Sequence, residues 1–154
     1  MTALRARAWW VLAFFAVTLV LFGATDLAAG VNADPAITVA IAGRTPAEVE
    51  ADDPTGYRLY DFAARNLGLG LVVMGTLLTA IVLIPYRAGQ RWAWRLVWVL
   101  PAWAAVVPLQ YLAFGLAPDQ PPAPPMISGP IIAAVASVAL LIDRRRFTSE
   151  SARS

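Results

Sequence analysis

Cysteine and histidine are both absent from the sequence. Their absence excludes disulfide bonds, thiolate catalysis, haem ligation by histidine and the usual zinc sites. It also removes the commonest general base and the side chain that most often titrates near neutral pH. An enzyme built from this chain would have to work with Asp, Glu, Arg or Tyr, and we expect neither a metal nor a cofactor. Lysine is missing as well, so all 12 basic residues are arginine, a preference that we attribute to a GC-rich genome.

Charged residues are scarce too. They make up 14% of the 154 residues, and hydrophobic residues make up 59%, whereas about a quarter of a typical soluble domain is charged. Four apolar runs, at about 9–29, 62–86, 92–116 and 124–142, account for the excess. A helix needs about 20 apolar residues to cross a bilayer, and the first three runs reach that length. The sequence predicts an all-α membrane protein of one domain, 1–154: a four-transmembrane-helix bundle with a short outer segment, 30–61, between the first two helices.

The arginines lie mainly on one side of this four-span arrangement. Nine of the 12 precede the first run, separate the second from the third, or follow the fourth: Arg5, Arg7, Arg87, Arg91, Arg95, Arg144, Arg145, Arg146 and Arg153. The opposite side has eight of the 10 acidic residues. Basic residues in short loops mark the cytoplasmic side of a membrane. We therefore expect both termini, with the tail 143–154, in the cytoplasm, and the segment 30–61 and the proline-rich loop 117–123 outside.

A cleaved signal peptide is the alternative interpretation of the first run. Arg5 and Arg7 would form its basic start, and VNA at 31–33 resembles a small-residue cleavage site. The run is about 21 residues long, however, whereas the apolar core of a signal peptide usually has about 7–15. We favour an uncleaved span; cleavage would leave three.

The outer segment contains three local patterns. ITVAI at 37–41 is β-branched and would form either a short strand or a stretch along the membrane surface. TPAE at 45–48 is typical of a helix start, with Thr45 as N-cap, proline next and Glu48 at the third helical position. DDPTG at 52–56 predicts a turn. We expect a short helix at about 46–51, then the turn, then the second long helix from near Tyr57. The clustered carboxylates of this segment lack the spacing of a calcium-binding loop, so we interpret them as a solvated face.

Small residues recur on one face of the second and fourth predicted spans. The second has Ala64, Gly68, Gly75 and Thr79, and the fourth has Gly129, Ala133 and Ser137. Membrane helices associate through such faces, because small side chains let two backbones approach closely. We expect both faces to be buried within the bundle; a homodimer interface is the competing use.

The third span contains Pro101 and Pro108, which are seven residues apart and so share a helical face. Each lacks a backbone donor, and we expect each to bend the helix. Gln110 is the amide placed deep within this span. Polar side chains at such depth usually face the interior of a bundle.

Ionisable residues at membrane depth are candidates for function, and here they gather near the outer ends of the first two spans. Arg65 and Asp61 share a helix face, and Asp26 lies at a similar depth. One hypothesis is an outward-facing pocket in which Arg65 binds an anionic head group or a carboxylate. The ligand-binding candidates are Asp26, Asp61, Arg65, Asn66 and Gln110. The simpler interpretation, which we favour, is a structural ion pair from Arg65 to Asp26 or Asp61.

GQRWAWRLVW at 89–98 combines three tryptophans with two arginines between the second and third spans. Indole rings gather at membrane surfaces with the ring N–H hydrated, and arginines reach toward lipid phosphates. Nucleic-acid bases would need an exposed groove, but the following residues are deeply apolar. We therefore predict membrane-interface anchors: Trp9, Trp10, Arg91, Trp92, Trp94, Arg95 and Trp98. The arginines at 144–146 are interpreted as a topology anchor.

Through YRAGQRWAW at 86–94 and ARNLGLGLVVMG at 64–75, the chain resembles small bacterial four-helix membrane proteins of DoxX-like layout. The resemblance implies a compact bundle in the bacterial plasma membrane and no particular activity. We expect a non-catalytic accessory, structural or lipid-binding protein, whose partners are membrane lipids and either another protein or a second copy, with no nucleic acid. The alternative is a small transporter or membrane enzyme acting on a lipid-like or anionic substrate in the outward-facing pocket. A transporter usually has two related halves, and we find none in the sequence.

Overall fold

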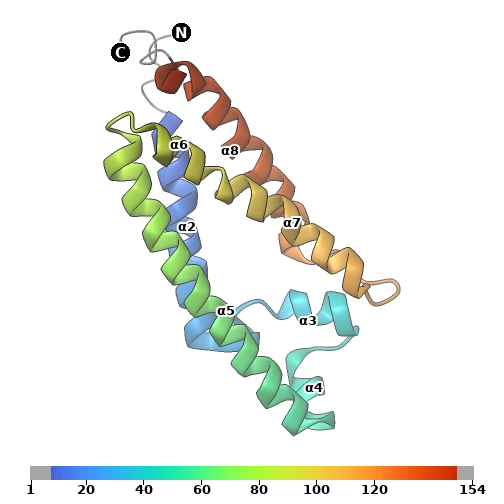
Figure 1. The fold of residues 1–154 in the computed structure, drawn as a ribbon. Coiled ribbons are helices and arrows are strands. Elements are labelled where there is room, and N and C mark those ends of the chain that lie inside the picture. Colours follow the sequence, from blue (N-terminus) through green and yellow to red (C-terminus); the bar gives the residue numbers. More distant parts are fainter. Residues whose placement is uncertain (1–7, 149–154) are drawn as a thin grey trace.

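The structure is a computed structural model, and it describes residues 8–148 (Figure 1). The predictions for Arg5, Arg7 and Arg153 concern positions outside these residues. Within them every regular element is a helix. Four helical stretches are long and apolar enough to cross a membrane: Ala8–Ala33, Pro54–Tyr86, Arg91–Phe114 and Pro124–Phe147. The all-helical prediction with four such stretches is confirmed.

The elements follow one another with short connections. In chain order they are α2 (Ala8–Ala29), the 3₁₀ turn η1 (Gly30–Ala33), α3 (Pro35–Ala42), α4 (Pro46–Asp52), α5 (Pro54–Ile81), the π-helical turn η2 (Val82–Tyr86), α6 (Arg91–Val97), α7 (Val99–Phe114) and α8 (Pro124–Thr148).

The outer segment is helical throughout its regular parts, so the strand considered for 37–41 is wrong. Proline at the first position of α3 starts the helix, and Gly43 stops it with a left-handed φ of 68° and an N–H bond to Val39 O. These start and stop signals outweigh the strand preference of the β-branched residues. The short helix after Thr45 is confirmed, with both hydrogen bonds of the capping box present. The next helix begins at Pro54, earlier than expected, because the Asp53 side chain accepts from the N–H groups of Thr55 and Gly56.

The third span is interrupted at Trp98, between α6 and α7. Pro101 has no N–H to donate to the carbonyl of Val97, four residues earlier, so the helix loses a bond at that point. Pro108 lies within α7 without ending it. Each proline was expected to bend the helix. Within residues 91–114, the structure has one interruption, about one turn before Pro101, and none at Pro108.

The four long helices form two pairs. α2 packs along α5, and α7 packs along α8. The pairs meet near the start of α2 and the end of α8, where α8 contacts α2 and α6 crosses over, and they diverge toward the opposite end (Figure 1). We call the first end the basic end, because it includes Arg87, Arg91, Arg95 and the arginines at 144–146, and the other the acidic end. α3 lies between the diverging pairs at the acidic end (Figure 1).

Candidate functional site

Glycines set the contact between α2 and α5. A Cβ atom at Gly68 would lie 2.5 Å from the backbone nitrogen of Leu27, and one at Gly75 would lie 2.8 Å from the carbonyl oxygen of Ala16. Gly23, on α2, faces this seam from the other side, with Gly68 O only 2.6 Å from where its Cβ would be. Backbones this close leave no room for a side chain. The predicted small-residue face of the second span therefore lies against the first span of the same chain.

The other small residues of the two patterns are partly buried. Ala64 and Thr79 are half-buried, and the Thr79 hydroxyl donates to Gly75 O at 2.7 Å within its own helix. On α8, a Cβ at Gly129 would lie 2.7 Å from Ala104 O of α7. Ala133 and Ser137 are half-buried. The glycine of this face thus contacts the neighbouring helix of its own pair.

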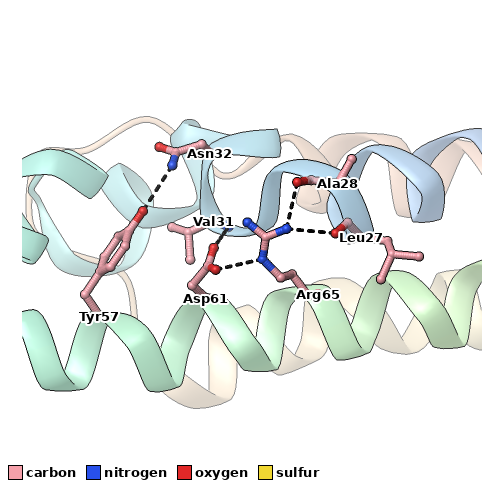
Figure 2. A network of polar contacts seen from close by, with 7 residues as sticks. All are labelled: Leu27, Ala28, Val31, Asn32, Tyr57, Asp61 and Arg65. Carbon is pink, nitrogen blue, oxygen red and sulfur yellow. Dashed lines mark hydrogen bonds and ion pairs between the residues drawn. The ribbon is translucent and has the colours of Figure 1, made fainter.

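Arg65 lies where α2 ends (Figure 2). Its Nε donates to Asp61 Oδ2 at 2.7 Å, and its Nη1 donates to the carbonyl oxygens of Leu27 at 2.9 Å and Ala28 at 2.7 Å. The last carbonyls of a helix have no partner within it and carry partial negative charge. A guanidinium at this point satisfies two of them and interacts favourably with the helix dipole.

Asp61 completes the same junction. Its Oδ1 accepts from the N–H of Val31 at 3.0 Å, and Gly30 has a φ of 58° beside it. Any Cβ at Gly30 would lie 1.8 Å from Asp61 Oδ1. Asn32 adds a hydrogen bond from Nδ2 to the hydroxyl of Tyr57 at 3.0 Å (Figure 2). Arg65 and Asp61 together therefore join α5 to the end of α2, which is the geometry of a structural ion pair.

The remaining ligand-binding candidates do not converge on Arg65. Asp26 is half-buried on α2, beside Gly68, and is near enough to Asp34 for the two carboxylates to repel each other. Gln110 is exposed on α7, so the expectation that it faces the interior of the bundle is wrong. Asn66 follows Arg65 in the chain but lies in a separate groove. The ion-pair partner of Arg65 is Asp61, not Asp26.

The groove beside Asn66 runs along α5. It has a volume of about 520 Å³, within the range of roughly 300–1,000 Å³ found for small-molecule sites. It is lined by Asn66, Leu69, Gly70, Val73, Met74, Leu77, Leu78 and Ile81 of α5 and by Leu96 and Val99 of the third span. We call it the α5–α6 groove.

Gly70 makes a notch in the wall of this groove. A Cβ atom there would meet nothing within 4 Å, in contrast to Gly68 and Gly75 on the other face of the same helix. The sequence contains a signal for this groove, since apolar residues recur at three- and four-residue spacing from 69 to 81 around a glycine that belongs to neither small-residue face. What it could not indicate is that, within residues 8–148, the third span covers this stripe only near the basic end.

A cluster of aromatic and polar side chains joins the spans at the basic end. The Tyr86 hydroxyl donates to Asp143 Oδ2 at 2.9 Å, and both residues are buried. The rings of Tyr86 and Phe147 are 5.0 Å apart. Arg91 Nε donates to Phe147 O at 2.8 Å. Phe147 lies beyond the predicted end of the fourth span at 142, so this cluster explains why α8 is longer than expected.

The tryptophans near this cluster have different surroundings. Trp94 Nε1 donates to Leu140 O of α8 at 3.0 Å, so the prediction that its N–H is hydrated at the membrane surface is wrong. Trp9 and Trp98 are half-buried, whereas Trp10 is 61% exposed and Trp92 is 52% exposed. Arg87 lies over the Trp9 ring, with its guanidinium carbon 4.4 Å from the ring centroid, which is the geometry of a cation–π contact.

Comparison of the chain with protein-family models, with curated proteins and with solved structures found no match. The resemblance to DoxX-like membrane proteins therefore stays a prediction.

Proposed function

We propose that this chain is an integral membrane protein that crosses the bacterial plasma membrane four times, with its basic end in the cytoplasm. Two observations support the proposal. Large apolar side chains are exposed on all four long stretches, including Phe14, Leu67, Leu112 and Ile131, and lipid tails would cover them. The arginines of the loop 87–91 and of 144–146 lie at one end, as the positive-inside rule requires of cytoplasmic loops.

The function that we propose is lipid binding by a non-catalytic accessory protein, and the observation that supports it best is the α5–α6 groove. Nine of its 10 lining residues are apolar, so it offers contacts to a hydrocarbon chain along its length. The pocket first considered around Arg65 has less support, because Arg65 and Asp61 already bind the end of α2. The transporter or enzyme alternative depended on Asp26, Arg65 and Gln110, and those side chains do not meet.

The experiment is to fill the groove from inside. Gly70→Phe places a ring in the notch, where an added Cβ atom would meet nothing within 4 Å, and Ala134→Phe adds the same ring to an exposed position of α8 outside the groove. Both proteins are purified in mild detergent and retained lipid is measured by native mass spectrometry. We expect the wild-type protein and Ala134→Phe to retain equal amounts of lipid. Gly70→Phe should retain roughly tenfold less, which corresponds to a loss of about 1.4 kcal/mol in binding free energy. Equal retention in all three would contradict groove binding.

A further inference from the structure

We propose that the α5–α6 groove selects an anionic phospholipid, whose acyl chain lies along α5 and whose phosphate is held by Arg95 at the basic end. This inference rests on the lipid-binding function proposed above. It adds the class of lipid, the direction in which the lipid lies and the residue that recognises its head group.

The dimensions of the groove fit a hydrocarbon chain better than a helix. The lining of α5 extends from Asn66 to Ile81, which is about 22 Å at 1.5 Å per residue. A partner helix of that length and about 10 Å across would occupy roughly 1,700 Å³, three times the 520 Å³ present. An acyl chain is thinner and has no polar group to satisfy along its length. The lining matches this, because only Asn66 has a polar side chain.

The basic end of the groove has the residues that a head group would require. Leu96 and Val99 line the groove, and helical spacing puts Trp92 and Arg95 on the same side of the third span, up to one turn closer to the basic end. Both residues are exposed. Trp92 Nε1 donates to Gln90 Oε1 at 2.6 Å, which holds its ring beside the chain reversal. An indole and a guanidinium at this depth match the head-group region of a bilayer.

Arg95 differs from the neighbouring arginines in its contacts. Arg87 stacks on Trp9, Arg91 donates to Phe147 O, and Arg146 donates to Arg87 O. Between residues 8 and 148, Arg95 has no hydrogen bond and no ion pair with another residue. Its guanidinium is thus available to an external anion, and a guanidinium can bind two phosphate oxygens at once.

Charge determines which way the lipid lies and which lipid fits. The opposite end of the groove lies at Asn66, one residue after Arg65. The Arg65 guanidinium is already bound to Asp61 and to two backbone carbonyls, so this end offers a phosphate less than the basic end does. At the basic end an anionic head group meets several arginines. The head group of phosphatidylcholine has the same phosphate but adds a cationic amine, which those arginines repel. Arg95 therefore favours a lipid with net negative charge, as expected of a cytoplasmic leaflet.

The test is a titration of the purified full-length protein with phosphatidylglycerol and phosphatidylcholine of identical acyl chains, followed by native mass spectrometry. We expect the wild-type protein to bind phosphatidylglycerol roughly tenfold more tightly, a difference that corresponds to about 1.4 kcal/mol. Arg95→Gln should remove this preference while phosphatidylcholine binding stays unchanged. Arg95→Lys should recover part of it, because the charge remains and the two-point contact does not. Arg58→Gln, which removes an exposed arginine at the acidic end, is the matched control and should behave as wild type.

The outcomes separate the two proposals. If wild-type protein binds both lipids equally, but Gly70→Phe still lowers binding, the head-group assignment is wrong and the proposed function stands. If Arg58→Gln lowers the preference as much as Arg95→Gln, the selectivity comes from net charge and the assignment to Arg95 is wrong. If Gly70→Phe leaves the binding of both lipids unchanged, both proposals are wrong. Arg95 is exposed, so loss of folding would not explain a change at this position; the melting temperature of each variant verifies that.

Discussion

The basic and the acidic ends of the molecule hold the same four helices by different means. At the basic end, side chains of one span bind residues of another. The Tyr86 hydroxyl donates to Asp143, Trp94 Nε1 donates to the backbone oxygen of Leu140, and Arg87 stacks on Trp9. At the acidic end, Arg65 joins α5 only to its own partner α2. Within residues 8–148, a backbone hydrogen bond from Ala117 N to Ala40 O at 2.9 Å joins α3 to the loop that follows α7.

This difference accounts for the groove. α5 is held against α2 along its length by Gly68 and Gly75, but it contacts the third span mainly near the basic end. The third span leaves α5 at the break at Trp98, so the apolar stripe of α5 that faces this side lies open. The glycines of α5 thus determine that it pairs with α2. The large side chains at the basic end hold the two pairs together there, and the pairs separate beyond them.

The largest effect should come from breaking the α2–α5 pair, on which both ends depend. Gly75→Leu places a side chain where Ala16 O lies 2.8 Å from the would-be Cβ, and we expect a loss of roughly 3 kcal/mol or more in the free energy of unfolding, at the upper end for overpacking. Gly70→Leu is the matched control on the open face. It should be neutral or slightly stabilising, because leucine is a better helix former than glycine by about 1 kcal/mol.

Unfolding in mixed detergent micelles measures both glycine variants. The control also bears on the groove proposal. If Gly70→Leu is stable, a change in lipid binding caused by a side chain at position 70 is not the result of misfolding. If Gly75→Leu were as stable as Gly70→Leu, the close contact of α2 with α5 would not exist.

A smaller effect should come from Tyr86→Phe at the basic end. The substitution removes the hydroxyl that binds the buried Asp143 carboxylate, at a cost of about 1–3 kcal/mol. Tyr60→Phe is the matched change at the acidic end, where the hydroxyl is 3.4 Å from Thr38 Oγ1, and it should cost under about 1 kcal/mol. The free energy of unfolding of both variants tests whether the basic end is the more firmly held. Equal losses, or a greater loss at Tyr60, would contradict that comparison.

Arg65→Gln should have a local effect of about 1 kcal/mol, since the side chain is 41% exposed and solvent screens exposed ion pairs. Its loss frees the carbonyls of Leu27 and Ala28, so the end of α2 should fray. Hydrogen exchange by mass spectrometry should show faster exchange at residues 27–33 and unchanged exchange around Tyr86 and Phe147. Faster exchange at both ends would mean that the two ends are coupled more tightly than their contacts indicate.

The sequence predicted the elements whose signals are local. The capping box at Thr45 and the glycine spacing of α5 depend on neighbours in the chain, and both lie where expected. The basic-end cluster could not be predicted, because Tyr86 and Asp143 are 57 residues apart and nothing local marks them as partners. The tryptophan-rich stretch was ambiguous for the same reason: whether the Trp94 N–H meets water or Leu140 O depends on how α8 packs. The groove exists because the third span does not pack along the whole apolar stripe of α5. A single sequence does not show which helices pack against that stripe.

The smallest effect is expected in the outer segment of the acidic end, at the start of α4. Glu48 accepts from Thr45 N at 2.7 Å, and hydrogen bonds from the Thr45 backbone and side chain lower the pKa of the Glu48 carboxyl. Because the pKa of Glu48 is lowered in the folded state, the charged cap stabilises α4 fully when the pH is above the ordinary glutamate pKa of about 4.3. This contribution is lost as the pH falls through the folded-state pKa. Cα chemical shifts of residues 46–52 in micelles should therefore lose helical character in acid. Glu48→Gln can form the same cap without a titrating proton, so comparing it with the wild-type protein separates Glu48 from the nearby Asp52 and Asp53. If both proteins lost helicity at the same pH, the carboxylates beside Glu48 would be the cause, and the start of α4 would depend on Thr45 alone.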